Sequence, residues 1–188
     1  MIIEKVRNEL MRRNQEYIEK YENFNFWEQH IKYVVAESLK LADELGADKE
    51  IVELGALLHD IALVSNVGTK VDHHTSGAKI AEDILVAFNY QKDKMKKVIN
   101  CVLHHRSCKN AETVEEMCVC DADILAHFDN IPMMFECAYK VHKFETIAEA
   151  NEWIIKSFEK DFNDLSERTR AIFKKKYDNI VSVLFGNL

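Results

Sequence analysis

The sequence predicts an all-α fold, and three observations support this prediction. Apolar residues recur at helical spacing along nearly all of the 188 residues. No segment alternates apolar and polar residues as a half-buried strand would. One proline and five glycines leave few residues that favour hairpins and tight turns. Hydrophobic residues make up 47% of the chain, which suits a single compact domain over residues 1–188.

The N-terminal part is predicted to form three helices. The first covers residues 1–22 and is charged outside a narrow apolar stripe. The second covers residues 26–45 and ends at Gly46, which offers a C-cap. The third covers residues 48–63 after an N-cap at Asp48, and it is apolar on nearly every side. Such a helix is typically buried.

A segment without periodicity, residues 65–72, separates these helices from the rest of the chain. Further helices are predicted at 73–89, 91–106, 111–128, after Pro132, 146–163 and 166–185. Thr113 and Glu116 fit a capping box at the start of one of them. The two amphipathic helices within 146–185 are expected to pack on the core, although they could also form a homodimer surface.

The net charge of −7 argues against broad binding to nucleic acid, but it leaves room for a small anionic substrate beside a metal. No apolar run approaches a membrane span, and no signal peptide opens the chain. The cysteines are Cys101, Cys108, Cys118, Cys120 and Cys137. Their odd number and spacing favour small buried side chains over a disulfide framework, so we expect a cytoplasmic protein.

His59 and Asp60 lie in the most apolar stretch of the chain, residues 51–63. Imidazole and carboxylate groups are rarely buried unless a partner satisfies them. A divalent metal would satisfy both groups, and so would hydrogen bonds to each other or to the backbone. The dipeptide alone does not choose between these interpretations.

Further histidines fall where helix geometry turns them inward. His30 borders the apolar face of its helix, and His73 and His74 open another helix. His105 continues the apolar stripe of its helix, whereas His104 lies about 100° away around the axis. Each of them alone could be an ordinary histidine at a helix end or at the edge of the core.

Asp121 and Asp123 repeat the puzzle, because their helix is apolar on most sides. Together with the histidines, they make a set of imidazole and carboxylate groups spread over five predicted helices. Such ligands without thiolate suit manganese, iron, cobalt, nickel, magnesium or zinc. The sequence therefore predicts a divalent metal site.

From Trp27 to Asp129 the chain resembles the HD-domain superfamily of metal-dependent phosphohydrolases, whose name describes a His-Asp pair. The matching motifs are His59-Asp60 within Ala56-Leu-Leu-His-Asp-Ile, His30-Ile-Lys-Tyr-Val, His73-His-Thr-Ser-Gly-Ala and Asp121-Ala-Asp-Ile-Leu. The Gly-Tyr-Pro motif of the cyclic dinucleotide branch and the His-Asn pattern of the mammalian-type cyclic-nucleotide phosphodiesterases are missing.

The resemblance implies a metal site, and the expected ligands are His30, His59, Asp60 and Asp123. Asp123 is preferred over Asp121 because it precedes the Ile-Leu pair of the family pattern. In branches with two metals, His73 and His105 occupy the places of the further ligands, and His73 is preferred over His74 by its spacing to Ala78. In branches with one metal these histidines contact substrate, and both alternatives remain open.

The expected function is hydrolysis of a phosphate ester or phosphoanhydride, with a nucleotide as the leading substrate candidate. Asp60 is both a ligand and the candidate to orient or deprotonate the attacking water. Candidates for substrate contact are His104, Lys70, Lys79, Arg106 and Lys109. His127 could support Asp123. The alternatives are a non-catalytic sensor that binds nucleotide or metal, and a di-iron oxygenase.

Overall fold

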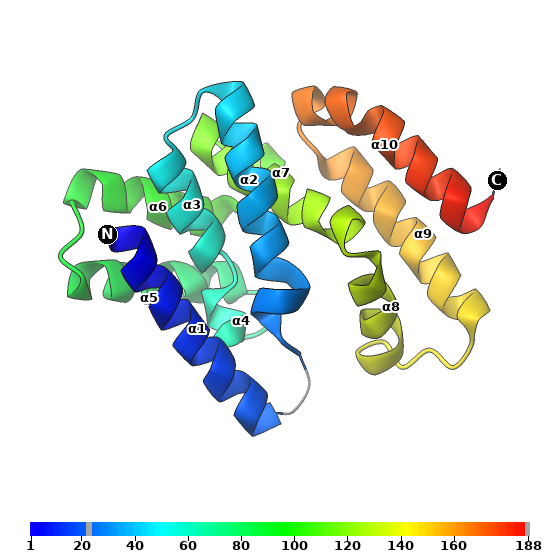
Figure 1. Cartoon of the computed structure of the whole chain (residues 1–188), viewed down its shortest axis with the longest axis horizontal. Helices are drawn as coiled ribbons and strands as arrows, with labels where there is room; N and C mark the ends of the chain where they lie inside the picture. The colour runs from blue at the N-terminus through cyan, green and yellow to red at the C-terminus, as the bar shows by residue number, and fades with distance from the viewer. Residues whose placement is uncertain (22–23, 187–188) are drawn as a thin grey trace.

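The computed structural model describes residues 1–21 and 24–186, which form helices and contain no strand (Figure 1). The elements are α1 (Ile2–Tyr21), a π-helical turn η1 (Trp27–Ile31), α2 (Lys32–Leu45), α3 (Lys49–Leu58), α4 (Ile61–Val64), α5 (His73–Ala87), α6 (Lys92–His104), a 3₁₀ turn η2 (Cys108–Asn110), α7 (Val114–Asp129), α8 (Ile131–Lys140), α9 (Ile147–Asp164) and α10 (Glu167–Phe185). The all-α prediction is confirmed.

Helix α3 is the centre of the core. It contacts α1, α2, α6 and α7, and all of its residues from Leu54 to Leu58 are buried. Its N-terminus is capped as predicted, because the Asp48 carboxylate accepts hydrogen bonds from the backbone N–H groups of Glu50 and Ile51. A central helix buried on all sides fixes the positions of whatever follows its C-terminus.

The prediction of a single helix over residues 48–63 is wrong. The structure has two helices there, α3 and α4, separated at His59 and Asp60. Asp60 has φ −104° and ψ 18°, outside the helical region and near the bridge region where many active-site residues lie. The helix predicted over 26–45 also begins irregularly, with the π-helical turn Trp27–Ile31. Both irregularities fall at candidate metal ligands, which agrees with the frequent location of π turns at functional sites.

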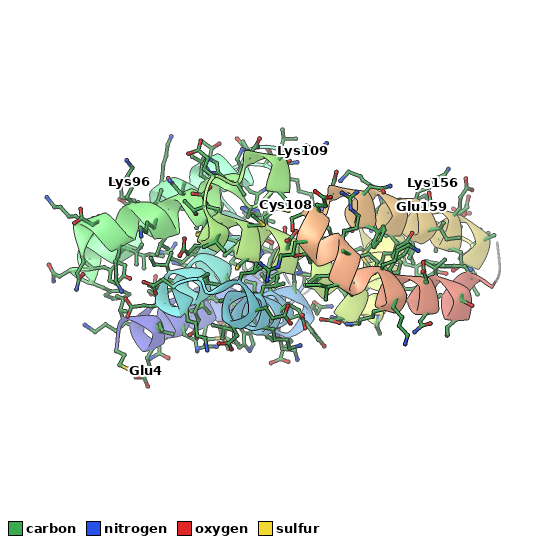
Figure 2. The ribbon with its side chains drawn as sticks, turned by 90° about the horizontal axis from the view of Figure 1, so that it is seen from above. Glu4, Lys96, Cys108, Lys109, Lys156 and Glu159 are labelled. Atoms are coloured by element: carbon green, nitrogen blue, oxygen red, sulfur yellow. A yellow bond between two sulfur atoms is a disulfide. The ribbon has the colours of Figure 1, made fainter. Side chains whose placement is uncertain are left out.

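The C-terminal helices α9 and α10 pack beside α7 and α8 at one end of the elongated molecule (Figures 1 and 2). The ring of Phe128 on α7 lies 4.5 Å from that of Phe158 on α9 and 5.0 Å from that of Phe173 on α10. The N-terminus of α10 is held by Asp121, whose carboxylate accepts hydrogen bonds from Ser166 and Thr169. Aromatic packing and this polar contact together fix the two helices on α7.

Two local expectations are wrong. The capping box at Thr113 is only half formed, because the Glu116 carboxylate accepts from the Glu112 backbone N–H and contacts His104 instead of reaching back to Thr113. Cys108 and Cys120 form a disulfide, although we expected none; Cys108 lies beside Lys109 on one side of the molecule (Figure 2). The cysteine pattern therefore no longer supports a cytoplasmic location. Among the described residues, no helix has the length and apolar character needed to cross a membrane.

Gly55 lets α3 and α6 approach closely, and we expect Gly55→Ala to destabilise the fold. A Cβ at this position would lie 2.7 Å from the Cβ of Cys101, which is closer than such atoms approach in proteins. Overpacking of this kind costs about 1–3 kcal/mol of unfolding free energy, measurable by urea denaturation. Cys101→Gly removes the Cβ that the new methyl group would meet, so the double variant should lose less stability than the two single variants summed. Additive losses would contradict this packing.

Candidate metal centre

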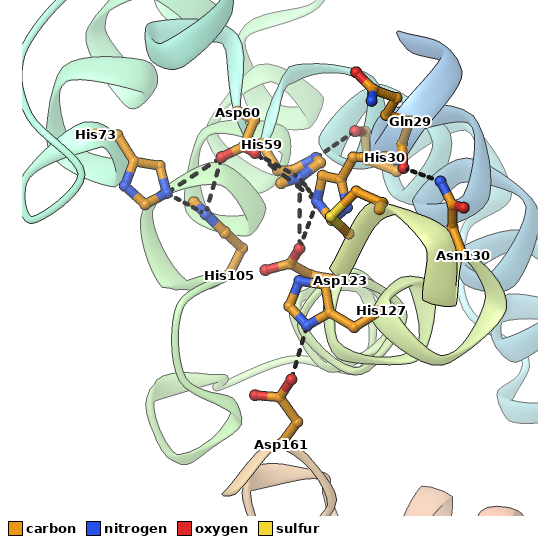
Figure 3. A network of polar contacts seen from close by, with 12 residues as sticks. Gln29, His30, His59, Asp60, His73, His105, Asp123, His127, Asn130 and Asp161 are labelled. Carbon is orange, nitrogen blue, oxygen red and sulfur yellow. Dashed lines mark hydrogen bonds and ion pairs between the residues drawn. The ribbon is translucent and has the colours of Figure 1, made fainter. Parts of the chain in front are cut away.

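Four ionisable side chains converge where η1, the α3–α4 break and α7 meet (Figure 3). The Nε2 atom of His30 lies 2.9 Å from Oδ1 of Asp123 and 3.2 Å from Nε2 of His59. Oδ2 of Asp60 lies 3.5 Å from Nε2 of His59 and 3.8 Å from Nε2 of His30. The four predicted ligands of the first metal therefore lie close together. Two groups that share His30 could each hold an ion, one with His59 and Asp60 and the other with Asp123 and His127.

A second group adjoins the first on the other side of Asp60 (Figure 3). Nε2 of His73, at the start of α5, lies 2.9 Å from Nε2 of His105, just after α6. Oδ1 of Asp60 lies 3.2 Å from His73 Nε2 and 3.8 Å from His105 Nε2. Asp60 thus turns one carboxylate oxygen to each group, so it belongs to two potential metal-binding groups, one with His30 and His59 and the other with His73 and His105.

The protonation pattern of the histidines fits a cation. The Nδ1 atoms of His59, His73 and His105 each lie within 2.9 Å of a backbone carbonyl oxygen, so in the neutral ring each Nδ1 carries the proton. The Nε2 atom of His73 then faces that of His105 at 2.9 Å, and the Nε2 atom of His59 faces that of His30 at 3.2 Å. When both rings of a pair are neutral, the two Nε2 lone pairs repel, whereas a divalent metal would accept both. Carbonyl groups that fix the tautomer in this way are typical of metal-binding histidines.

The electrostatics of the cluster keep both carboxylates charged. Burial alone would raise the pKa of Asp60 and of Asp123, but the neighbouring histidines outweigh it and hold both pKa values well below the usual range. Burial alone would lower the pKa of His59, yet the Asp60 carboxylate raises it to about 9. Burial lowers the pKa of His105 to about 4, with the positive charge of His59 adding to the effect. Two ionised acids in this setting would favour a divalent cation strongly.

Asp121 and Asp123 lie two residues apart on α7 and face different partners. Asp123 contacts His30 in the cluster, whereas the fully buried Asp121 turns towards α10. The neighbouring residues His104 and His105 also face different partners. His105 faces His73, whereas His104 contacts the buried Glu116 at 2.8 Å. His74 lies outside the cluster, and its Nδ1 is buried without a partner among the described residues.

The predicted basic residues are placed unequally. Lys70 lines a cavity that opens from the cluster, and its backbone carbonyl orients His73. Arg106 donates to the backbone carbonyl of Val71. Lys79 and Lys109 are exposed and do not line this cavity. Of these four candidates, Lys70 alone adjoins both the cluster and the cavity.

The pair of His127 and Asp161 adds a connection that the sequence did not indicate. His127 Nδ1 lies 2.8 Å from Oδ2 of Asp161 on α9, and its ring stacks on that of His30 at 5.6 Å. His127 also forms a potential metal-binding group with His30 and Asp123. The i, i+4 spacing from Asp123 places His127 on the same face of α7, but Asp161 belongs to an ordinary amphipathic helix and carried no signal.

A cavity of about 480 Å³ opens from this cluster to the surface. Its buried end is formed by His30, Asp60 and His127. The remaining lining residues are Tyr17, Phe24, Phe26, Lys70, Met133, Glu136, Cys137, Lys140, Val141 and Lys143. Cavities of about 300–1,000 Å³ are typical of small-molecule sites, so a substrate could reach the metal-binding residues from here.

Comparison with known proteins points to one family. The family model of the HD domain matches residues 27–127. Ribonuclease Y of Onion yellows phytoplasma is 26% identical over 125 residues, which are 63% of this chain and 22% of that protein. Ribonuclease Y of Thermus thermophilus is 33% identical over 86 residues, which are 46% of this chain and 14% of that protein. This chain therefore spans less than a quarter of the length of either relative.

A solved structure shares the fold. The crystal structure of a predicted HD superfamily hydrolase from an uncultured Thermotogales bacterium has a TM-score of 0.57 and 21% sequence identity. The match covers 89% of this chain and 91% of the other, so it includes helices outside the HD segment.

Asp123→Asn should reduce the metal content, whereas Asp121→Asn should reduce the stability of the fold. Asp123→Asn removes a charged group that contacts His30, so we expect loss of bound metal in elemental analysis. Asp121→Asn weakens the hydrogen bonds to Ser166 and Thr169, so we expect about 1–3 kcal/mol lower stability with metal content retained. Metal loss in Asp121→Asn alone would reverse the assignment.

Removal of metal should make stability depend on pH between about 6.5 and 9. Without metal, the folded state raises the pKa of His59 from 6.5 to about 9, so its proton stabilises the fold below pH 6.5. This contribution is lost as pH rises through about 9. The melting temperature of chelator-treated protein should therefore fall across this interval, as followed by circular dichroism. Metal-loaded protein should not show this fall, and a His59→Ala variant should show a smaller one, because the pKa values of His73 and His127 are also raised. A flat profile for the chelator-treated chain would contradict the prediction.

Proposed function

This chain belongs to the HD-domain family, and we propose that it is a metal-dependent phosphohydrolase whose substrate is a nucleotide. The observation that carries the proposal is the placement of Asp60 between two converging pairs of histidine Nε2 atoms, at the end of an open cavity. Two of its relatives are named ribonucleases, which supports a phosphate ester of a nucleotide as substrate. Because nucleotides are intracellular metabolites, we also propose a cytoplasmic location.

The residues of the cluster have distinct parts in this reaction. His30, His59, Asp60 and Asp123 would hold one metal, and His73 and His105, with Asp60, would hold a second metal or contact the phosphate. Bound divalent metal supplies Lewis acidity for the phosphoryl oxygens and lowers the pKa of a bound water towards neutrality. The ionised Asp60 carboxylate can accept a hydrogen bond from the attacking water and so orient it.

Hydrolysis adds the water oxygen to phosphorus and breaks the bond between phosphorus and the leaving oxygen, which takes up a proton. The protein's contribution is mainly to position these groups. The backbone carbonyls of Ala56, Lys70 and Val102 fix the rings of His59, His73 and His105. Asp161 fixes the ring of His127 at the buried end of the cavity, where it can contact the phosphate.

Purified protein loaded with manganese, cobalt, nickel or magnesium should release phosphate from nucleotides or from simple phosphate esters. His59→Ala and Asp60→Asn should lower the rate by about 10²–10⁴-fold and reduce the metal content, since each removes a ligand. Lys79→Gln is the matched control, because Lys79 is exposed and does not line the cavity.

Two other results would replace this proposal. Nucleotide binding without phosphate release from any substrate would support a sensor, and oxygen consumption by iron-loaded protein would support an oxygenase. Protein that holds no metal and cannot be reloaded would contradict the metal centre itself.

A further inference from the structure

The walls of the cavity come mostly from parts of the chain outside the HD segment. Within residues 27–127, the lining consists of His30, Asp60, Lys70 and His127. The other lining residues belong to α1, to the segment before η1, and to α8 with the turn after it. The family match therefore accounts for the chemistry at the buried end, while these additional elements form the part that would distinguish substrates.

One wall is aromatic. The ring of Phe26 meets the ring of Tyr17 at 5.0 Å and that of Phe24 at 4.9 Å, both nearly edge-on. Met133 lies among the other apolar residues of the lining. A phosphate group at the buried end would leave most of the 480 Å³ free, and an aromatic wall offers a planar base a surface to stack on.

The rim of the same cavity carries three lysines, Lys70, Lys140 and Lys143, all of them exposed. Lys140 pairs with Glu136 at 2.6 Å, whereas Lys70 and Lys143 form no ion pair with any residue in the described part of the chain. Lys70 is close enough to α8 for its positive charge to oppose the rise in the pKa of the Cys137 thiol. Burial outweighs this effect, so the pKa of the thiol is still raised. In a chain of net charge −7, this is a local concentration of positive charge.

Lys143 occupies an unusual backbone position. Its φ of 60° lies in the left-handed region, at the turn where α8 ends and His142 N–H donates to the carbonyl of Cys137. Glycine adopts this conformation with little cost, whereas residues with a Cβ rarely do. The chain nevertheless places a lysine there, at the rim of the cavity.

We propose that the cavity binds a nucleotide whose sugar carries a second phosphate, apart from the phosphate that is cleaved. The base stacks on the wall formed by Tyr17, Phe24 and Phe26, and the second phosphate lies against the rim lysines. The first phosphate lies at the buried end beside His30 and Asp60. This placement rests on the proposed function, because it takes the cluster as the site of cleavage.

Calorimetric titration of the manganese-loaded chain tests this inference. Heats of binding give Kd for a nucleotide that is not cleaved, and heat rates give KM for one that is. Adenosine 3′,5′-bisphosphate should bind at least about fivefold more tightly than adenosine 5′-monophosphate, because each rim charge contributes modestly to binding. The monophosphate should in turn bind about tenfold more tightly than ribose 5-phosphate, which lacks the base.

Two variants and a control locate the effect. Lys143→Gly removes the charge at a position where glycine is favoured, so a loss of affinity cannot come from weaker folding. Combined with Lys140→Gln, it should abolish the preference for the bisphosphate, and higher salt should reduce this preference in the unchanged chain. Lys156→Gln should keep the preference, because Lys156 lies on the solvent side of α9, away from the cavity (Figure 2).

The outcomes separate this inference from the proposed function. Phosphate release with no preference for the bisphosphate, or a preference unchanged in the double variant, would overturn the inference alone. Lysine-dependent preference without phosphate release would overturn the proposed function and leave this site in place. Tighter binding of adenosine 5′-diphosphate would place the second phosphate beside the first, and tighter binding of a short RNA would assign the rim to a polymer. Both of these results overturn the inference.

Discussion

The structure depends on one electrostatic constraint, which is that six ionisable side chains lie close together, five of them buried and the sixth, Asp123, partly exposed. His59 and His105 are fully buried, and Asp60, His30 and His73 are nearly so. In the absence of a cation, the carboxylates and the imidazole nitrogens of the cluster can be satisfied only by the protons that they share. Several parts of the fold satisfy this constraint. Backbone carbonyl groups orient the rings, α3 ends directly at the cluster, and each Asp60 oxygen faces one of the two neighbouring groups.

The irregular parts of the helices are where this constraint alters the backbone. A regular helix over residues 48–63 would continue past Asp60 with helical dihedrals, but Asp60 leaves that region and the chain turns into α4. Gly77 packs against this turn. A Cβ there would lie 3.3 Å from a methyl group of Val102, a tight contact, and 3.5 Å from the His59 carbonyl oxygen, an ordinary one. The π-helical turn gives His30 its place opposite Asp123.

The sequence indicated which side chains would gather at the candidate site better than it indicated the backbone around them. His59, Asp60 and the pair Asp121 and Asp123 could be singled out because polar residues inside an apolar helix require partners. The preference for Asp123 over Asp121 came from the family resemblance. Helical periodicity likewise predicted most of the helices. The break at Asp60 was not identifiable, since the apolar pattern continues through it. Asp161 and Lys143 belong to surface-like segments, and the pairing of Cys108 with Cys120 arises only when η2 folds against α7.

Helix α7 presents Asp123 and His127 to the metal centre and Asp121 and Phe128 to the C-terminal helices. Asp161 of α9 completes the connection, because it holds His127 against His30. Binding of a metal at this centre would consequently be linked to docking of the C-terminal pair. Whatever free energy a bound ion gains from an ordered His127 must reappear, by reciprocity, as protection of the α9 and α10 amides against hydrogen exchange. The end of the chain would thus report on the centre without containing any of its ligands.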